Sequence, residues 1–243
     1  MKIKKIIFKK ITFINIKNLQ FKNILSKKGV YLFPSGPGLS SLNYDTKYSK
    51  SLKEADYVFF DSGYFVLLLR LFKSLKVNKF SGFKFLEYFF RYLSKNKDKI
   101  IFSIDPDLNQ SEFNRKYFDK IGVKKVFSYI APIYKKSNIV DKKLINQIKK
   151  VKPNYILTNI AGGKQEILGL YLKNNLNFKT SIYCTGGAIS FFTGLQPPVN
   201  KLFDYLYLGW LIRIIFKPRL FLIRYLSAFK LIIKVYSEKI SIK

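Results

Sequence analysis

The sequence predicts an α/β fold in which a mainly parallel sheet carries helices on both faces. Short apolar runs alternate along the chain with longer stretches of helical periodicity, which is the pattern of repeated strand–helix–strand units. Hydrophobic residues make up 48% of the 243 residues, so the chain can bury a sizeable core despite its high charge. We therefore expect a Rossmann-like arrangement, without internal repeats or low-complexity linkers.

The apolar runs place the strands, and the periodic stretches between them place the helices. We expect strands at residues 30–33, 57–60, 99–104, 125–130, 154–160 and 181–184. We expect helices at residues 46–55, 64–75, 83–94, 108–121, 139–149 and 164–174.

A change of composition near Gln196 divides the chain. After the following Pro-Pro pair, only two acidic residues stand against nine basic ones. The expected organisation is a basic N-terminal segment at residues 1–28, an α/β core with the candidate site at residues 29–195, and a C-terminal helical appendage at residues 196–243.

The appendage contains a basic amphipathic pattern over residues 219–236. Its cations and Ser227 fall on one arc of a helix, and aliphatic and aromatic side chains fill most of the remainder. This pattern fits a helix that lies on an anionic bilayer. It also fits a helix that packs on the core and leaves a basic edge in solvent.

The residue inventory excludes several kinds of chemistry. The chain has no His and one Cys, which rules out an intrachain disulfide, a standard His/Cys zinc site, and Ser-His-Asp or Cys-His catalysis. Acid–base work would fall to carboxylates, Lys or Tyr. The single Cys184 lies in an apolar run and is expected to be a small buried residue.

Among the basic residues that give the chain its formal charge of +31, the arginines say most about function. Lys, Asn, Ile, Phe and Tyr are all abundant, as expected of an AT-rich genome, so the lysine excess alone says little. Arginine occurs six times, and Arg213, Arg219 and Arg224 fall within twelve residues. Because a guanidinium group binds phosphate through two donors in a fixed fork, this cluster indicates a phosphate-bearing ligand.

No targeting or membrane-spanning segment is predicted. The start of the chain mixes Lys with Ile and Phe and lacks a cleavage site, so it does not resemble a signal peptide. No stretch reaches about 18 apolar residues without a charge. We expect a cytoplasmic protein.

Candidate site residues follow the predicted strands, because ligands of open α/β sheets bind beyond the carboxyl ends of the strands. The second strand is followed by Asp61 and a glycine turn, where a partly dehydrated carboxylate would suit a general base or would simply cap a helix. The first strand leads into Ser35 and Gly36, in a Pro/Gly loop that suits either close approach of a ligand or a plain turn.

Two glycine turns open helices after the later strands. Backbone N–H groups at such helix starts suit phosphate or sugar hydroxyls, although the spacing is not that of a Walker P-loop. The candidate residues are Gly162, Gly163, Gln165, Glu166, Gly186 and Gly187.

A D-x-D pattern follows the third predicted strand. In many sugar transferases this pattern holds a divalent metal. Capping of the next helix by Asp, with Pro at its first position, explains Asp105 and Asp107 equally well.

Taken in order, four segments of the chain resemble the WecG/TagA/CpsF glycosyltransferase family. The similarity runs from about residue 29 to residue 228, and the C-terminal segment is its most specific part. The segments are A-D-Y-V-F-F-D-S-G (55–63), G-G-K-Q-E (162–166), C-T-G-G-A-I-S-F-F-T-G (184–194), and L-G-W-L-I-R-I-I-F-K-P-R (208–219) with R-Y (224–225).

The resemblance implies an inverting enzyme of surface polysaccharide biosynthesis that uses no metal or other cofactor. It would move a sugar, of N-acetylmannosamine or glucose type, from a nucleotide-diphosphate donor such as a UDP-sugar. The acceptor would be linked to polyprenyl diphosphate, and the enzyme would be peripheral on the inner face of the cell membrane. Asp61 would be the catalytic base. Substrate contacts would come from Gln165, Lys79, the loop and turn residues above and the three arginines, which would hold the donor diphosphate.

Several positions depart from the family pattern. Phe33-Pro34-Ser35 replaces Thr-x-Asn, Lys79 replaces Arg, and Lys84 and Ser190 replace Asp. The resemblance therefore carries the fold and the reaction class and leaves the sugar open.

Two alternatives come from other functional classes. The basic charge and 17% aromatic content would suit a nucleic-acid-binding protein, although no nucleic-acid module is recognised and no such partner is expected. The departures from the family pattern also leave a catalytically inactive lipid-glycan binder as an alternative.

Overall fold

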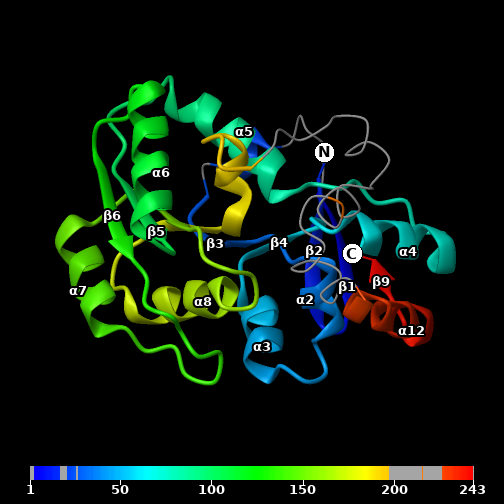
Figure 1. Cartoon of the computed structure of the whole chain (residues 1–243). Helices are drawn as coiled ribbons and strands as arrows, with labels where there is room; N and C mark the ends of the chain where they lie inside the picture. The colour runs from blue at the N-terminus through cyan, green and yellow to red at the C-terminus, as the bar shows by residue number, and fades with distance from the viewer. Residues whose placement is uncertain (1–2, 17–20, 26, 197–214, 216–225, 243) are drawn as a thin grey trace.

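The structure is a computed structural model that describes residues 3–16, 21–25, 27–196, 215 and 226–242 (Figure 1). Its described strands form one sheet in the order β6-β5-β7-β8-β3-β4-β2-β1-β9. From β6 to β2 every neighbouring pair is parallel, as the α/β prediction requires. The strands predicted from sequence are β3 (Gly29–Leu32), β4 (Tyr57–Phe59), β5 (Ile101–Asp105), β6 (Val126–Ile130), β7 (Tyr155–Thr158) and β8 (Ser181–Cys184).

Three further strands join the two ends of the chain to this sheet. β1 (Lys4–Phe8) and β2 (Ile11–Asn15) form an antiparallel hairpin, and β2 pairs in parallel with β4. β9 (Ser241–Ile242) pairs with β1. The apolar residues of the basic N-terminal segment at residues 1–28 therefore extend the sheet. The domain boundaries stay predictions.

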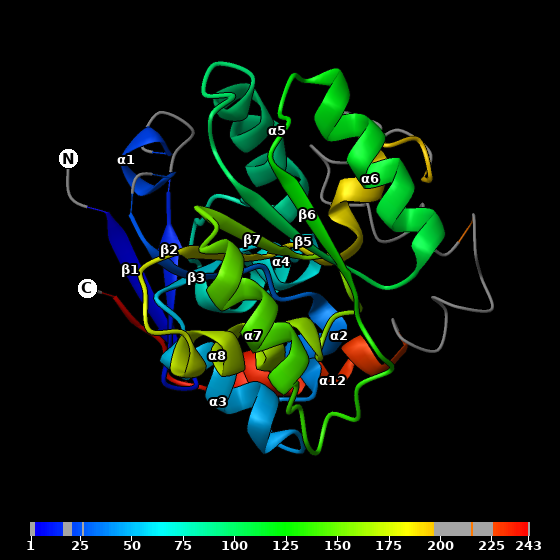
Figure 2. The same ribbon diagram turned by 90° about the vertical axis from the view of Figure 1, so that its left-hand side faces the viewer.

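Helices cover both faces of the sheet, which confirms the predicted fold class (Figure 2). Alternation along each strand separates the faces, so that Val30 and Leu32 of β3 join one core and Tyr31 joins the other. One face carries α2 (Gly36–Ser40), α3 (Thr46–Glu54), α4 (Gly63–Lys73), α7 (Lys142–Val151), α8 (Gln165–Asn175) and α12 (Lys230–Ser237). The other carries α1 (Lys22–Leu25), α5 (Gly82–Leu93), α6 (Leu108–Lys120) and the 3-10 helix η2 (Gly186–Phe191).

Aromatic rings fill the core beneath α5. Tyr183 of β8 lies between Tyr31 of β3, at 4.9 Å between ring centroids, and Tyr155 of β7, at 5.6 Å. Phe85 and Phe89 of α5 pack edge-on to Tyr183 at 4.6 and 4.9 Å. Much of the high aromatic content is therefore buried and serves packing.

Side-chain caps explain where most helices begin. Ser62 starts α4 by accepting the N–H of Phe65 at 3.2 Å, and Asp107 starts α6 by accepting the N–H of Gln110 at 2.7 Å. Asp141 caps α7, which therefore starts at Lys142 and not at residue 139.

The D-x-D pattern has structural partners. Its second carboxylate, Asp107, is the α6 cap, so Pro106 precedes the cap and is not the first helical residue. Asp105 is fully buried, and its Oδ1 accepts hydrogen bonds at 2.8 Å from Ser103, Asn114 and Asn159. The helix-cap interpretation thus applies to Asp107, while Asp105 ties β5 to α6 and to the end of β7.

The contact between α8 and β8 offers a test of the packing. A Cβ at Gly169 would lie 2.5 Å from Cys184 Sγ. We expect Gly169→Ala to lower the free energy of unfolding by about 1 kcal/mol, because overpacking costs more than the ~1 kcal/mol of helix propensity gained. Adding Cys184→Ala should recover much of the loss, since it removes the sulfur that the new methyl meets.

Chemical denaturation of the two single variants, the double variant and the wild type checks this packing. Strict additivity of the two single effects would show that the two side chains do not compete for the same space.

Candidate active site

The carboxyl ends of β4, β3, β8 and β7 lie side by side at one edge of the sheet. We call the segments that follow them (residues 60–63, 33–38, 184–187 and 158–166) the strand-end loops. Two glycines show how closely these loops approach one another and the start of α5. A Cβ at Gly36 would lie 3.0 Å from Ser62 Oγ, and a Cβ at Gly82 would lie 3.6 Å from both Phe33 and Thr185.

Asp61 lies directly after β4, at the junction of two helix starts. Asp61 does not cap α4, whose cap is Ser62. Its Oδ1 instead accepts the N–H of Gly82, the first residue of α5, at 2.9 Å. The side chain is partly exposed. The positive ends of two helix dipoles therefore meet a carboxylate that ligands can reach.

Gln165 begins α8 at the neighbouring strand-end loop. Its side-chain amide packs against Gly186, where an added Cβ would lie 3.2 Å from both Nε2 and Oε1. Gly186 also has a positive φ of 56°, so this turn requires glycine on two grounds. Gln165 is buried, and its Oε1 has no hydrogen-bond partner in the described part of the chain. A ligand could supply the missing donor.

Glu166 is 1% exposed and lies beside Gln165. Its Oε2 accepts the N–H of Gly163 at 2.7 Å, and its Oε1 accepts a long hydrogen bond from Gln165 Nε2 at 3.4 Å. Burial raises the pKa of Glu166 to about 7, against smaller lowering effects of these hydrogen bonds and of Lys136. Lys136 pairs with Asp45 at 3.2 Å.

Tyr48 of α3 lies near the same edge of the sheet. Its buried hydroxyl lies against Gly38, in the loop after β3. Burial and then the charges of Glu166, Asp45 and Asp61 raise the pKa of Tyr48 well above its usual value. The hydroxyl therefore lies within electrostatic range of both Asp61 and Glu166.

Sequence reasoning missed Tyr48 as a site residue. Its hydroxyl and Thr185 Oγ1 are buried without a hydrogen-bond partner among the described residues. Thr185 lies inside a segment that carries the family resemblance, so the sequence offered a signal for it. No pattern distinguishes Tyr48 from the other tyrosines of the chain.

The remaining predicted loop residues surround the same edge. Ser35 caps α2, with its Oγ 3.4 Å from Gly38 N. Lys79 is partly exposed and precedes Phe80, whose N–H pairs with the carbonyl of Phe60 at 2.9 Å. Gly162 and Gly187 are exposed on their turns. The structure thus gathers the predicted core residues at one edge; their roles stay predictions.

The arginine cluster at positions 213, 219 and 224 lies outside the described residues. The described residues on either side of residues 197–225 both contact strand-end loops. Gln196 Nε2 donates to the carbonyl of Gly187 at 3.4 Å. The Ala228 Cβ lies 3.9 Å from the position of a Cβ at Gly36.

The C-terminal helix α12 (Lys230–Ser237) covers the described end of the basic amphipathic pattern, and it packs on the core as one of the two sequence interpretations expects. It packs on the core through Leu231 and Val235. Lys234, expected on a solvated polar arc, is instead buried, with its Nζ 5.2 Å from the ring centre of Tyr44. Ile233 and Tyr236 are exposed on α12, and Leu226 and Phe229 are exposed in the residues just before it; we call these four side chains the apolar stripe.

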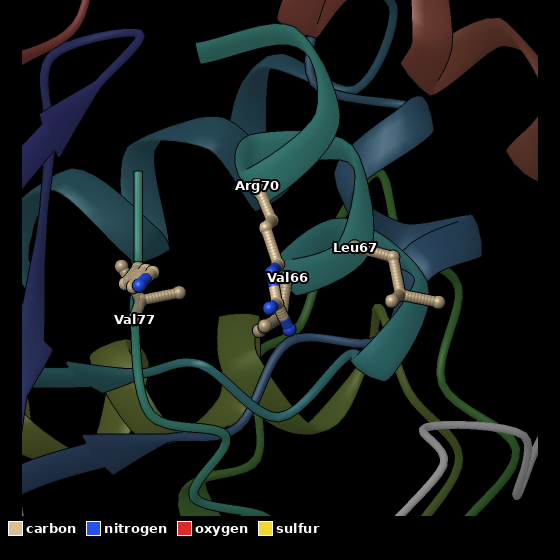
Figure 3. A pocket seen from close by; sticks show the side chains of 5 residues that line it. Val66, Leu67, Arg70 and Val77 are labelled. Carbon is tan, nitrogen blue, oxygen red and sulfur yellow. The ribbon is translucent and has the colours of Figure 1, made fainter. Parts of the chain in front are cut away.

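A cavity of about 220 Å³ lies beside α4 (Figure 3). Val66, Leu67 and Arg70 line it from the helix, and Lys76 and Val77 line it from the segment that follows. None of these residues belongs to the strand-end loops. The chemically distinctive groups therefore lie elsewhere, around Asp61 and Gln165.

The described residues show neither a metal-ion cluster nor a membrane-spanning helix. They contain no group of three or more His, Cys, Asp or Glu side chains placed to hold a metal ion. None of the helices in these ranges is both long enough and apolar enough to cross a membrane.

Comparison with known proteins gives one family. The model of the family described as "Glycosyl transferase WecG/TagA/CpsF family" matches residues 3–243, essentially the whole chain. No curated protein matches the sequence.

The burial of Glu166 predicts how stability changes with pH. Its folded pKa of about 7 exceeds the ordinary 4.5. Its contribution to stability is therefore fully present below pH 4.5 and is lost as the pH rises through 7. We expect Glu166→Gln to gain stability relative to wild type from pH 5 to pH 8.5, by roughly 3 kcal/mol in the limit. Thermal unfolding across this range checks the difference.

Glu54→Gln provides the matched control, because Glu54 lies exposed at the end of α3. A stability difference between Glu166→Gln and wild type that stays constant with pH would contradict the assignment.

Proposed function

This chain belongs to the WecG/TagA/CpsF glycosyltransferase family, and from that membership we propose that Asp61 catalyses sugar transfer at the strand-end loops. The family establishes a glycosyltransferase of cell-envelope glycan biosynthesis, with a nucleotide-sugar donor and a lipid-linked acceptor. The proposed reaction is inverting and metal-independent, with a UDP-sugar as donor and a polyprenyl-diphosphate-linked acceptor. The sugar is of N-acetylmannosamine or glucose type.

The single observation that carries this proposal is the placement of Asp61. The Gly82 N–H fixes one of its oxygens, and the carboxylate stands at the edge where β3, β4 and β8 end. In the proposed step an acceptor hydroxyl attacks the anomeric carbon and Asp61 takes the hydroxyl proton. The bond from that carbon to the diphosphate oxygen breaks, and the nucleotide diphosphate leaves with the electron pair. A general base must be held within hydrogen-bond reach of the proton that it removes, and the bond from Gly82 holds the Asp61 carboxylate in place.

Negative charge grows on the leaving diphosphate and needs nearby cations. We assign this role to the three arginines of the C-terminal segment. Support comes from the contact of Ala228 with Gly36, because the four residues from Arg224 to Ala228 span at most about 14 Å.

The apolar stripe of α12 supports a position on the membrane surface. Two of its four large side chains are exposed on the helix and two just before it, and Leu71 is exposed on the neighbouring α4. The cations Arg70, Lys73 and Lys230 belong to the same two helices. Apolar side chains flanked by cations are the surface that an anionic bilayer binds. We propose that the protein is peripheral on the inner face of the cell membrane, where a lipid-linked acceptor resides.

The nucleic-acid alternative receives less support from the structure. Base stacking needs exposed rings. The rings that cluster on β3, β7 and β8, with Tyr183 at their centre, are buried in the core.

The first test replaces the proposed base. Asp61→Asn keeps an oxygen for the Gly82 N–H, so folding should be unchanged. Loss of the general base should lower kcat/KM by about 100- to 10,000-fold. Nucleotide release from a panel of UDP-sugars with membrane lipid extract measures the effect. Asp98→Asn, at an exposed acid paired with Lys99, is the control. Equal turnover in wild type and Asp61→Asn would refute the assignment.

The second test addresses the membrane surface. Phe229→Glu/Ile233→Glu places two acids in the apolar stripe, and we expect at least roughly tenfold weaker binding to phosphatidylglycerol vesicles, equivalent to ~1.4 kcal/mol. Co-sedimentation with vesicles measures the binding. Ile133→Glu is the control, because Ile133 is 94% exposed in the loop after β6, away from the apolar stripe. Equal loss in the control and the double variant would argue against a specific docking face.

A further inference from the structure

Gln165 and Glu166 form a hydrogen-bonded pair of buried side chains at the start of α8. Glu166 accepts on both carboxylate oxygens, from Gly163 N–H and from Gln165 Nε2. In the second of these bonds, the Nε2 end of the Gln165 side-chain amide points toward Glu166. While Nε2 faces Glu166, the opposite end of the amide, Oε1, has no partner within the described ranges.

An amide side chain has two chemically different ends. Its carbonyl oxygen accepts hydrogen bonds, whereas its NH2 group only donates. A buried carbonyl without a partner is costly, so Gln165 Oε1 calls for a donor from a ligand, such as a sugar hydroxyl or an N–H group. Gly186 keeps the space beside this amide free of a side chain.

A proton on Glu166 reverses this requirement. The protonated carboxyl group carries an O–H donor and needs an acceptor. The Gln165 amide already contacts this carboxyl group, and its Oε1 is an acceptor without a partner in the described part of the chain. Rotation of the amide by half a turn would bring Oε1 to the Glu166 O–H and direct the NH2 group toward the ligand.

We propose that Glu166 is a positioning residue, whose protonation state decides which end of the Gln165 amide faces the substrate. The carboxylate form holds Nε2 and leaves Oε1 to accept from a hydroxyl or N–H group of the donor or acceptor sugar. The protonated form turns Oε1 away, and productive binding is lost. This inference rests on the proposed function, because it assumes that sugar binds at the strand-end loops.

The surroundings of Glu166 place this change near neutral pH. Burial raises the pKa of Glu166 to about 7, so both forms are populated in the physiological range. The charged group that acts on it is Lys136, from the segment after β6, which favours the carboxylate and is itself paired with Asp45. Tyr48 of α3 and Cys184 of β8 also face it, and their pKa values are raised by burial, so both stay neutral.

The amide orientation can be tested without any substrate. In the full-length protein, the side-chain amide signals of Gln165 are assigned by their loss in Gln165→Ala and followed by NMR from pH 5.5 to 8.5. We expect them to titrate with a midpoint near 7 in wild type. They should not titrate in Glu166→Gln, whereas Glu54→Gln should behave as wild type. Signals that do not titrate in wild type would overturn the proposal.

The catalytic consequence is tested on the same variants. In wild type, kcat/KM for UDP-sugar should fall about tenfold from pH 8 to pH 6, as the carboxylate fraction of a group with pKa of about 7 does. Glu166→Gln should be slow at both pH values and as stable as wild type or more so. If Glu166 acts through Gln165, the double variant Gln165→Ala/Glu166→Gln should be no slower than Gln165→Ala.

The outcomes separate this proposal from the one on which it rests. Additive effects in the double variant, or a wild-type pH profile retained in Glu166→Gln, would overturn the role of Glu166 and leave the transferase intact. A wild type that neither binds UDP nor transfers sugar would overturn the proposed function itself. The assignment of Glu166 to substrate positioning would then fall with it, whatever the NMR titration shows.

Discussion

The parallel pairing of β3 between β4 and β8 is the constraint on which the candidate site depends. Parallel strands end at the same edge, so this pairing brings together segments that are about 150 residues apart in the sequence. Tight turns then let the loops touch, as at Gly82, which meets the ends of two strands and donates to Asp61. A shift in the register of β3 would separate Asp61 from Thr185 and remove the geometry on which any shared ligand depends.

The parallel core was predictable because its strands are short apolar runs between periodic helices. The N-terminal hairpin was not, because Lys4 and Lys5 stand exposed on a strand beside the sheet edge and hide its alternation. β9 is too short for any pattern to indicate it. Lys234 shows the limit of helical periodicity, since its side chain, the Nζ atom included, is buried while the apolar Ile233 is exposed. Only packing against α2 and α4 decides which side of α12 is covered.

The site was predictable where chemistry leaves a local mark. An acid after a strand and a glycine turn before a helix indicated Asp61 and Gln165, and the fold brings their loops to one edge. Tyr48 carries no such mark, because a mid-helix tyrosine is ordinary until tertiary structure places its hydroxyl among three carboxylates. Glu166 was predicted to contact substrate, and this role stays a prediction. Its hydrogen bonds to Gly163 and Gln165 could not be read from the sequence, because they depend on how the turn before α8 folds.

Contacts between the two ends of the chain hold α12 and β9 in place. β9 pairs with β1, and Lys9 in the β1–β2 turn pairs with Glu238 at 2.8 Å. Lys73 of α4 adds a bond to the carbonyl of Tyr236 at 2.8 Å. Since β2 lies next to β4, these contacts connect α12 to the strand that precedes Asp61. The N-terminal hairpin thus becomes part of what positions the C-terminal segment, because without β1 the last strand has no partner among the described strands.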